Sequence, residues 1–153
     1  MKSKTLGVSL AVWLAAGAVC FANPNMGTWK LNAAKSKIGR GMGRNENVTY
    51  EWDFFKIKVT INGTDAKGKP THNQWTGNFD GKDYPVTGDQ TSDTRSYTKV
   101  NENTTDFAAK KGGKITLKGR ITVAADGKSR TVVAWAKNSK GRMRKITAVY
   151  DKA

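Results

Sequence analysis

The segment FKIKVTI (residues 55–61) alternates strictly between apolar and polar side chains. A period of two is typical of a β-strand with one buried face, because successive side chains leave a strand on opposite sides. We therefore expect Phe55, Ile57, Val59 and Ile61 to share the buried face. The lysines between them are expected on the outer face.

The same alternation recurs along the chain, and turn residues separate the repeats. Asp80-Gly81-Lys82 and Asp126-Gly127-Lys128 are turns of the kind that join tight hairpins, because Asp-Gly supplies the positive φ that such turns need. Strands joined by tight turns are antiparallel neighbours. The expected strands lie near residues 27–31, 46–53, 55–63, 70–79, 82–87, 93–100, 104–110, 113–124, 128–138 and 141–151.

This order of elements predicts an all-β fold, a single antiparallel up-and-down β-barrel of about 8–10 strands. A sandwich would need long crossing connections, whereas closure of consecutive hairpins removes exposed strand edges. One long irregular stretch, residues 32–45, interrupts the pattern. Asn32 is expected to cap a helical turn over residues 33–35, and the glycine-rich remainder is expected to form a loop.

The N-terminus has the order of a secretory signal peptide. Lys2 and Lys4 precede an apolar run over residues 6–21, and small Ala22 follows it. We expect cleavage after Ala22, so that residues 1–22 are the signal peptide and residues 23–153 form one barrel domain, secreted or periplasmic. Lipoprotein anchoring at Cys20 is the alternative. Cys20 is the only cysteine, so the mature chain has no disulfide.

The composition is strongly basic. Without Lys2 and Lys4, 25 Lys and Arg remain against 12 Asp and Glu, a formal charge of +13. Such a charge attracts polyanions, but it is equally consistent with a solvated surface that has no specific partner. The basic residues are spread along the sequence, which leaves both interpretations open.

Gly27-Thr28-Trp29 at the head of the first expected strand resembles the G-x-W signature of lipocalins and related calycin barrels. GTWKLN with AKSK, WTGNFDGKDYPVTGD, DTRSY and VYDK together resemble small secreted bacterial lipocalin-like proteins. The resemblance implies that Trp29 closes one end of the barrel, that Gly27 lets the backbone pass close by, and that a late arginine covers the indole. Arg142 and Arg144 are the candidates for that arginine. The role of this group would be structural.

The barrel interior is the candidate ligand site, because a barrel of this size is either packed solid or holds one small ligand. Arg95 shares a face with Tyr97. Solvent exposure is the simpler interpretation of Arg95, but an inward guanidinium would need an anionic partner, such as Glu51 or the acid group of a ligand. Core packing is the competing interpretation for the aromatic side chains. The candidate lining residues are Tyr50, Trp52, Trp75, Phe79, Arg95, Tyr97, Phe107 and Trp135.

The sequence offers little for catalysis. His72 is the only histidine, and it is expected on the surface; Ser92, His72 and Asp93 are the residue types of a hydrolytic triad, but nothing brings them together. Without a second histidine or a mature cysteine we expect no metal site and no cofactor. Asp80, Asp83 and Asp89 are explained by turn capping, with a cation site as the alternative.

We therefore expect a non-catalytic, monomeric protein without a transmembrane segment in the mature chain, which binds a small amphipathic or apolar ligand inside the barrel. The alternative is a basic surface-binding module with a solid core, whose partner is a polyanion such as lipopolysaccharide, polysaccharide or nucleic acid.

Overall fold

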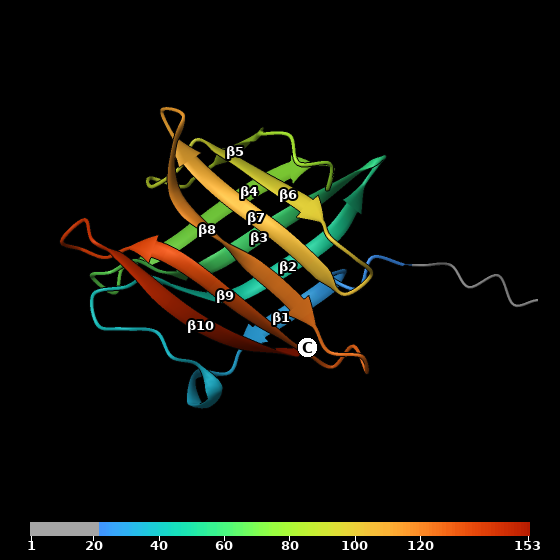
Figure 1. Ribbon diagram of the computed structural model, residues 1–153, viewed down its shortest axis with the longest axis horizontal. Coiled ribbons are helices and arrows are strands. Elements are labelled where there is room, and N and C mark those ends of the chain that lie inside the picture. The colour runs from blue at the N-terminus through green and yellow to red at the C-terminus, as the bar shows by residue number, and fades with distance from the viewer. Residues whose placement is uncertain (1–21) are drawn as a thin grey trace, which may run out of the picture.

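The computed structural model describes residues 22–153, and the expected signal peptide lies almost entirely outside that range. Ten antiparallel strands follow one another along the chain and close into a single barrel (Figure 1). The strands are β1 (Gly27–Leu31), β2 (Arg44–Asp53), β3 (Lys56–Thr64), β4 (Pro70–Gly77), β5 (Tyr84–Thr87), β6 (Thr94–Lys99), β7 (Thr104–Lys111), β8 (Lys114–Val123), β9 (Ser129–Lys137) and β10 (Met143–Lys152).

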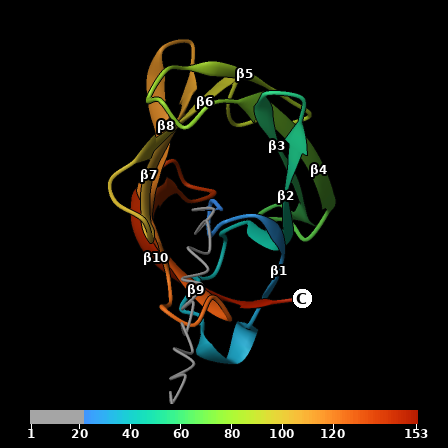
Figure 2. The ribbon, with the colours of Figure 1, turned by 90° about the vertical axis from the view of Figure 1, so that its right-hand side faces the viewer.

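Each strand pairs with its neighbours in sequence, and β1 closes the ring by pairing with both β2 and β10. Trp29 of β1 lies opposite Val48 on one side and Lys152 on the other. The view along the barrel in Figure 2 shows the strands as a ring. The predicted fold class, a single antiparallel up-and-down barrel, is therefore confirmed. Closure of the ring removes the free edge strands that an open sheet would expose.

Alternation places one face of each strand inside. In β3, Ile57, Val59 and Ile61 are buried as predicted. Phe55 is an exception to the predicted pattern, because the β2–β3 turn consists of Phe54 and Phe55 and leaves Phe55 94% exposed. Phe54 also has a φ of 54°, which is unfavourable for a bulky side chain.

The stretch between β1 and β2 contains a short 3₁₀ helix, η1 (Ala33–Lys35). The Asn32 side chain accepts a hydrogen bond from the Lys35 N–H, as predicted for a helix cap. The following loop returns to the barrel, where Met42 is buried and the Gly41 carbonyl accepts from the Ser139 N–H. This loop therefore packs against the β9–β10 turn.

Gly63 is required by close approach of two strands. A Cβ at this position would lie 1.9 Å from the carbonyl oxygen of Arg44, beside the irregularity between Asn45 and Asn47 in β2. No side chain fits between the two backbones, so glycine is needed at this bend of the sheet.

Candidate functional site

The side chain of Trp29 separates the barrel interior from the N-terminal segment, residues 22–26. Its indole is completely buried, and the indole N–H donates to the Asn25 carbonyl at 2.8 Å. Gly27 has a φ of 97°, and a Cβ there would lie 3.0 Å from the end of the Lys152 side chain. Trp29 is thus a core residue, while the atoms next to Gly27 belong to a flexible side chain and its positive φ is the feature that favours glycine.

The arginine that covers Trp29 is Arg130, and the prediction of Arg142 or Arg144 was wrong. The Arg130 guanidinium carbon lies 4.9 Å from the Trp29 ring centre, and Lys152 Nζ lies 4.4 Å from the same ring. Arg142 belongs to the β9–β10 turn and Arg144 to the start of β10, and both are exposed. Burial and the charge of Arg130 lower the pKa of Lys152 below its ordinary value.

The pairing of β9 with β8 and β10 places Arg130 on the inward face of the strand. Arg130 and Ala134 are buried, whereas Trp135 in the same strand is 45% exposed. Trp135 lies opposite Lys145 of β10 and Lys118 of β8 on the outer face, so its expected place inside the barrel was wrong. Both faces of β9 carry apolar side chains, and the alternation alone therefore does not say which face is inward.

An aromatic cluster fills one part of the interior. Tyr97 lies 4.7 Å from Trp75 and 4.9 Å from Phe79 between ring centres, and Tyr50 lies 6.4 Å from Tyr97. Trp75 is completely buried, and its indole N–H donates to the Arg95 carbonyl at 2.7 Å. Trp75 is therefore a core residue, and its contacts help to fix the backbone of β6 at Arg95.

Arg95 is buried, so its inward placement among the candidate lining residues holds and the simpler interpretation, solvent exposure, is wrong. Only 4% of it is accessible, and its Nη2 lies 3.2 Å from Asn73 Oδ1 and 3.4 Å from Asp89 Oδ2. The internal carboxylate is thus Asp89 of the β5–β6 loop. Glu51, the partner suggested by the sequence, instead forms an ion pair with Lys58 at 2.8 Å on the outer face.

Asp89 is held ionised next to Arg95. Burial acts against the charged form, but hydrogen bonds from Ser92 and Thr91 and the charge of Arg95 together lower the pKa of Asp89 below its ordinary value. Asp80 similarly accepts the Lys82 N–H, as expected for turn capping.

A cavity of about 50 Å³ lies inside the barrel, and both buried arginines border it. Among the described residues, no acceptor bonds to Nε or Nη1 of Arg130 or to Nη1 of Arg95. Four of the eight predicted lining residues, Tyr50, Arg95, Tyr97 and Phe107, border the cavity. The full lining is Asn45, Val48, Tyr50, Ile61, Arg95, Tyr97, Phe107, Leu117, Ile121, Arg130, Val132 and Tyr150.

The cavity has a positive electrostatic character. Arg130 rests on the rings of Trp29, Tyr50 and Tyr150, with its guanidinium carbon 4.9, 5.0 and 4.9 Å from the respective ring centres. Burial raises the pKa of Tyr150 to about 12 and that of Tyr97 further, so both phenols stay neutral at physiological pH. The interior therefore holds two guanidinium groups, of which Arg95 is paired with a carboxylate, that of Asp89, while Arg130 rests on aromatic rings.

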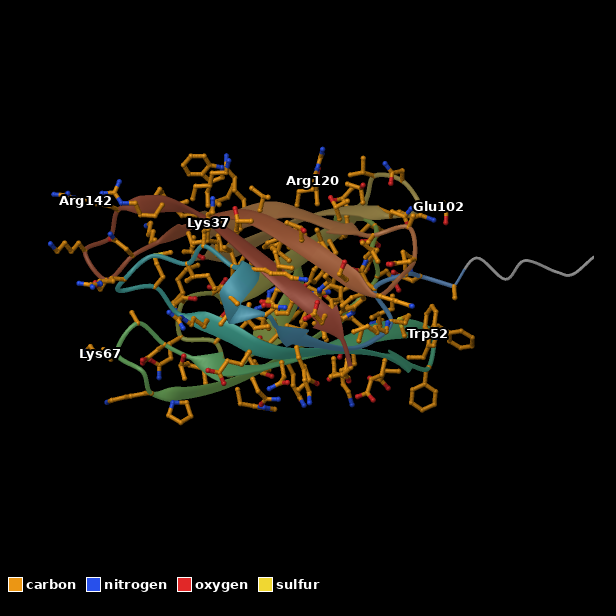
Figure 3. All side chains as sticks on the ribbon, turned by 90° about the horizontal axis from the view of Figure 1, so that it is seen from below. Lys37, Trp52, Lys67, Glu102, Arg120 and Arg142 are labelled. Atoms are coloured by element: carbon orange, nitrogen blue, oxygen red, sulfur yellow. The ribbon has the colours of Figure 1, made fainter. Side chains whose placement is uncertain are left out.

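Trp52 and Phe79 belong to a different site from the one expected. Trp52 is 63% exposed beside the β2–β3 turn, and both side chains border a surface pocket of about 170 Å³ next to Asn23 and Pro24. Figure 3 shows Trp52 at the same end of the barrel as Glu102. The central cavity and this pocket share no lining residue.

The residue types of a hydrolytic triad have separate partners. His72 is exposed, and its Nδ1 lies 2.7 Å from Asn62 Oδ1. Ser92 donates to Asp89, while Asp93 accepts the Gly112 N–H at 2.9 Å.

Within residues 22–153 no group of three or more His, Cys, Asp or Glu side chains gathers to hold a metal ion, and no helix is long and apolar enough to cross a membrane.

No family model and no curated protein matches this chain. Solved structures that are similar to it at low identity include three β-barrels. The redesigned β-barrel b11L5F_LGL is 13% identical with a TM-score of 0.45, over 85% of this chain and 92% of that one. EF1p2_mFAP2b bound to DFHBI is 13% identical with a TM-score of 0.46, over 85% and 94%. The redesigned β-barrel mFAP1, also bound to DFHBI, is 15% identical with a TM-score of 0.42, over 84% and 95%.

Proposed function

We propose that this protein is a non-catalytic, secreted or periplasmic lipocalin-like barrel that binds a small amphipathic acid in its interior. The observation that carries the proposal is the pair of buried guanidinium groups on one cavity, with three nitrogen atoms that no described acceptor bonds. A buried cation is costly unless an anion or hydrogen-bond acceptors compensate it. An acid group supplies both.

The geometry limits what the acid can be. Asp89 and Asn73 already engage Nη2 of Arg95, which leaves Nη1 of Arg95 and two nitrogens of Arg130 for an acid. A cavity of about 50 Å³ accepts a group of a few heavy atoms, such as a carboxylate. A complete drug-sized ligand needs several times this volume. An acyl chain would therefore have to displace apolar lining side chains such as Leu117 and Val132.

Catalysis has no comparable support. His72, the one imidazole of the chain, lies on the outer surface. Of the three tyrosines on the cavity, Tyr97 and Tyr150 have raised pKa values and keep their protons. The signal-like N-terminus and the lipocalin-like sequence features favour export and a carrier or binding role over an enzymatic one.

Thermal unfolding and calorimetric titration with octanoate, with octanamide as the uncharged control, test this proposal. Octanoate should bind and raise the Tm, whereas octanamide should do so much less, because hydrogen bonds to a charged group contribute about 1.5–3 kcal/mol each. Arg95→Gln should weaken octanoate binding by about tenfold or more. Equal effects of the acid and the amide, or no saturable binding of octanoate, would refute the proposal.

The matched control is Arg120→Gln. Arg120 lies on the outer face, where it forms a bidentate pair with Asp106 at 2.6 and 2.9 Å. The substitution removes the same charge as Arg95→Gln without reaching the cavity. Octanoate affinity should therefore stay at the wild-type value in Arg120→Gln.

A further inference from the structure

The antiparallel topology sorts the connections between strands into two groups, one at each end of the barrel. One group consists of residues 32–43, 65–69, 88–93, 112–113 and 138–142, and we call it the basic end. The opposite group consists of residues 54–55, 78–83, 100–103 and 124–128. Arg142 and Lys67 lie toward one end in Figure 3, and Trp52 and Glu102 lie toward the other.

Positive charge is concentrated at the basic end. Its loops carry seven basic and three acidic residues, while the loops of the opposite end carry two basic and four acidic residues. None of the seven forms an ion pair within the described part of the chain. They are Lys35, Lys37, Arg40, Lys67, Lys69, Lys140 and Arg142.

The three acids of the basic end have structural tasks. Asp65 accepts the N–H groups of Lys67 and Lys69, Asp89 accepts that of Thr91, and Asp93 accepts that of Gly112. The loops also contact one another, since the Ser139 N–H donates to the Gly41 carbonyl. Lys111 at the end of β7 donates from Nζ to the Gln90 carbonyl of a neighbouring loop. The basic side chains are thus held on neighbouring loops around one rim.

We infer that the basic end docks onto an anionic lipid bilayer. The charges form a broad rim on several short loops, which matches a surface of many headgroups. None of the five loops carries an aromatic side chain, the platform on which single-stranded nucleic acids stack.

Docking does not depend on an interior ligand, so this inference stands or falls separately from the proposed function. The loops of the opposite end carry more acidic than basic residues, so they gain less from the field of an anionic bilayer than the loops of the basic end. The protein would therefore orient with its basic end toward the membrane surface.

Co-sedimentation with phosphatidylcholine vesicles, with and without phosphatidylglycerol, tests the inference. We expect binding only with phosphatidylglycerol, and release at high salt. Each basic residue near such a surface contributes about fivefold in binding, so Lys140→Gln with Arg142→Gln should weaken it by about 25-fold. A second pair, Lys37→Gln with Arg40→Gln, should behave in the same way.

The matched control removes the same charge at the opposite end, with Lys82→Gln and Lys128→Gln, both exposed. This variant should bind phosphatidylglycerol vesicles as the wild type does. Equal losses in the control and in the basic-end variants would show attraction by net charge alone and overturn the inference. Tighter binding to heparin or single-stranded DNA than to the vesicles would overturn it as well.

Discussion

Replacement of Trp29 by alanine should destabilise the barrel severely. The side chain is completely buried, and truncation of a buried tryptophan costs about 3–5 kcal/mol. The hydrogen bond to the Asn25 carbonyl contributes about 1 kcal/mol more. Arg130 would also lose one of the three rings on which it lies.

The expected loss is therefore about 4–6 kcal/mol, a large part of the 5–15 kcal/mol typical of a single domain. Trp29→Phe should lose only about 1–2 kcal/mol, because it keeps most of the ring but not the N–H donor. Urea unfolding followed by far-UV circular dichroism measures both, because this signal arises mainly from the backbone.

Trp135→Ala is the control, since it removes the same side chain from the outer face of β9, where Trp135 is 45% exposed. Its cost should stay below about 1 kcal/mol. If Trp135→Ala were as costly as Trp29→Ala, the assignment of Trp29 as the residue that closes the interior would be refuted.

Three further substitutions test separate features. Gly63→Ala should destabilise by about 1–3 kcal/mol in urea unfolding, because its Cβ would collide with the Arg44 carbonyl; an unchanged midpoint would refute the close approach. Phe54→Gly should stabilise by about 1 kcal/mol, because glycine adopts a φ of 54° without strain, and a lower Tm would contradict this. Asp89 has a lowered pKa in the folded state, so its stabilising effect is complete above its unfolded pKa of about 4 and is lost as the pH falls through the lower folded value. Asp89→Asn should remove this part of the acid dependence and cost about 2 kcal/mol at pH 7, measured by urea unfolding across pH; an unchanged acid profile would exclude the pairing with Arg95.

The strand positions could be predicted from the sequence because alternation and turn residues are local signals. The expected segment at residues 128–138, for example, contains the observed strand Ser129–Lys137. The break after residue 53 was expected, but Phe55 was assigned to the following strand, because it continues the alternation of Ile57, Val59 and Ile61 and carries no turn signal.

The site was only partly predictable. Tyr50 and Tyr97 were placed on the cavity by alternation, but Arg130 was missed in favour of Arg142 and Arg144. The available signal was that Arg130 has the same parity as Val132 in β9. The alternate set of β9 residues, which contains Val133 and Trp135, is equally apolar. Only the pairing register with β8 and β10 therefore decides which of the two sets faces inward.

The distribution of charge could not be inferred from spacing. Lys37, Lys67 and Lys140 are far apart in the sequence, and their lysine-rich neighbourhoods look evenly spread. An antiparallel meander sends alternate turns to the same end, which gathers these residues at one rim. A sequence whose basic residues look evenly spread therefore folds into a barrel whose two ends differ in the charge of their loops.

The most direct test of the central claim, that the interior arginines hold an acid group, is the pKa of a bound carboxylate. Octanoate labelled with ¹³C at the carboxyl carbon reports this value by NMR as the pH is lowered. Next to Arg95 and Arg130 the bound acid should titrate clearly below the free acid, because a neighbouring cation favours the carboxylate. A bound carboxylate that titrates at or above the pKa of free octanoate would contradict the claim.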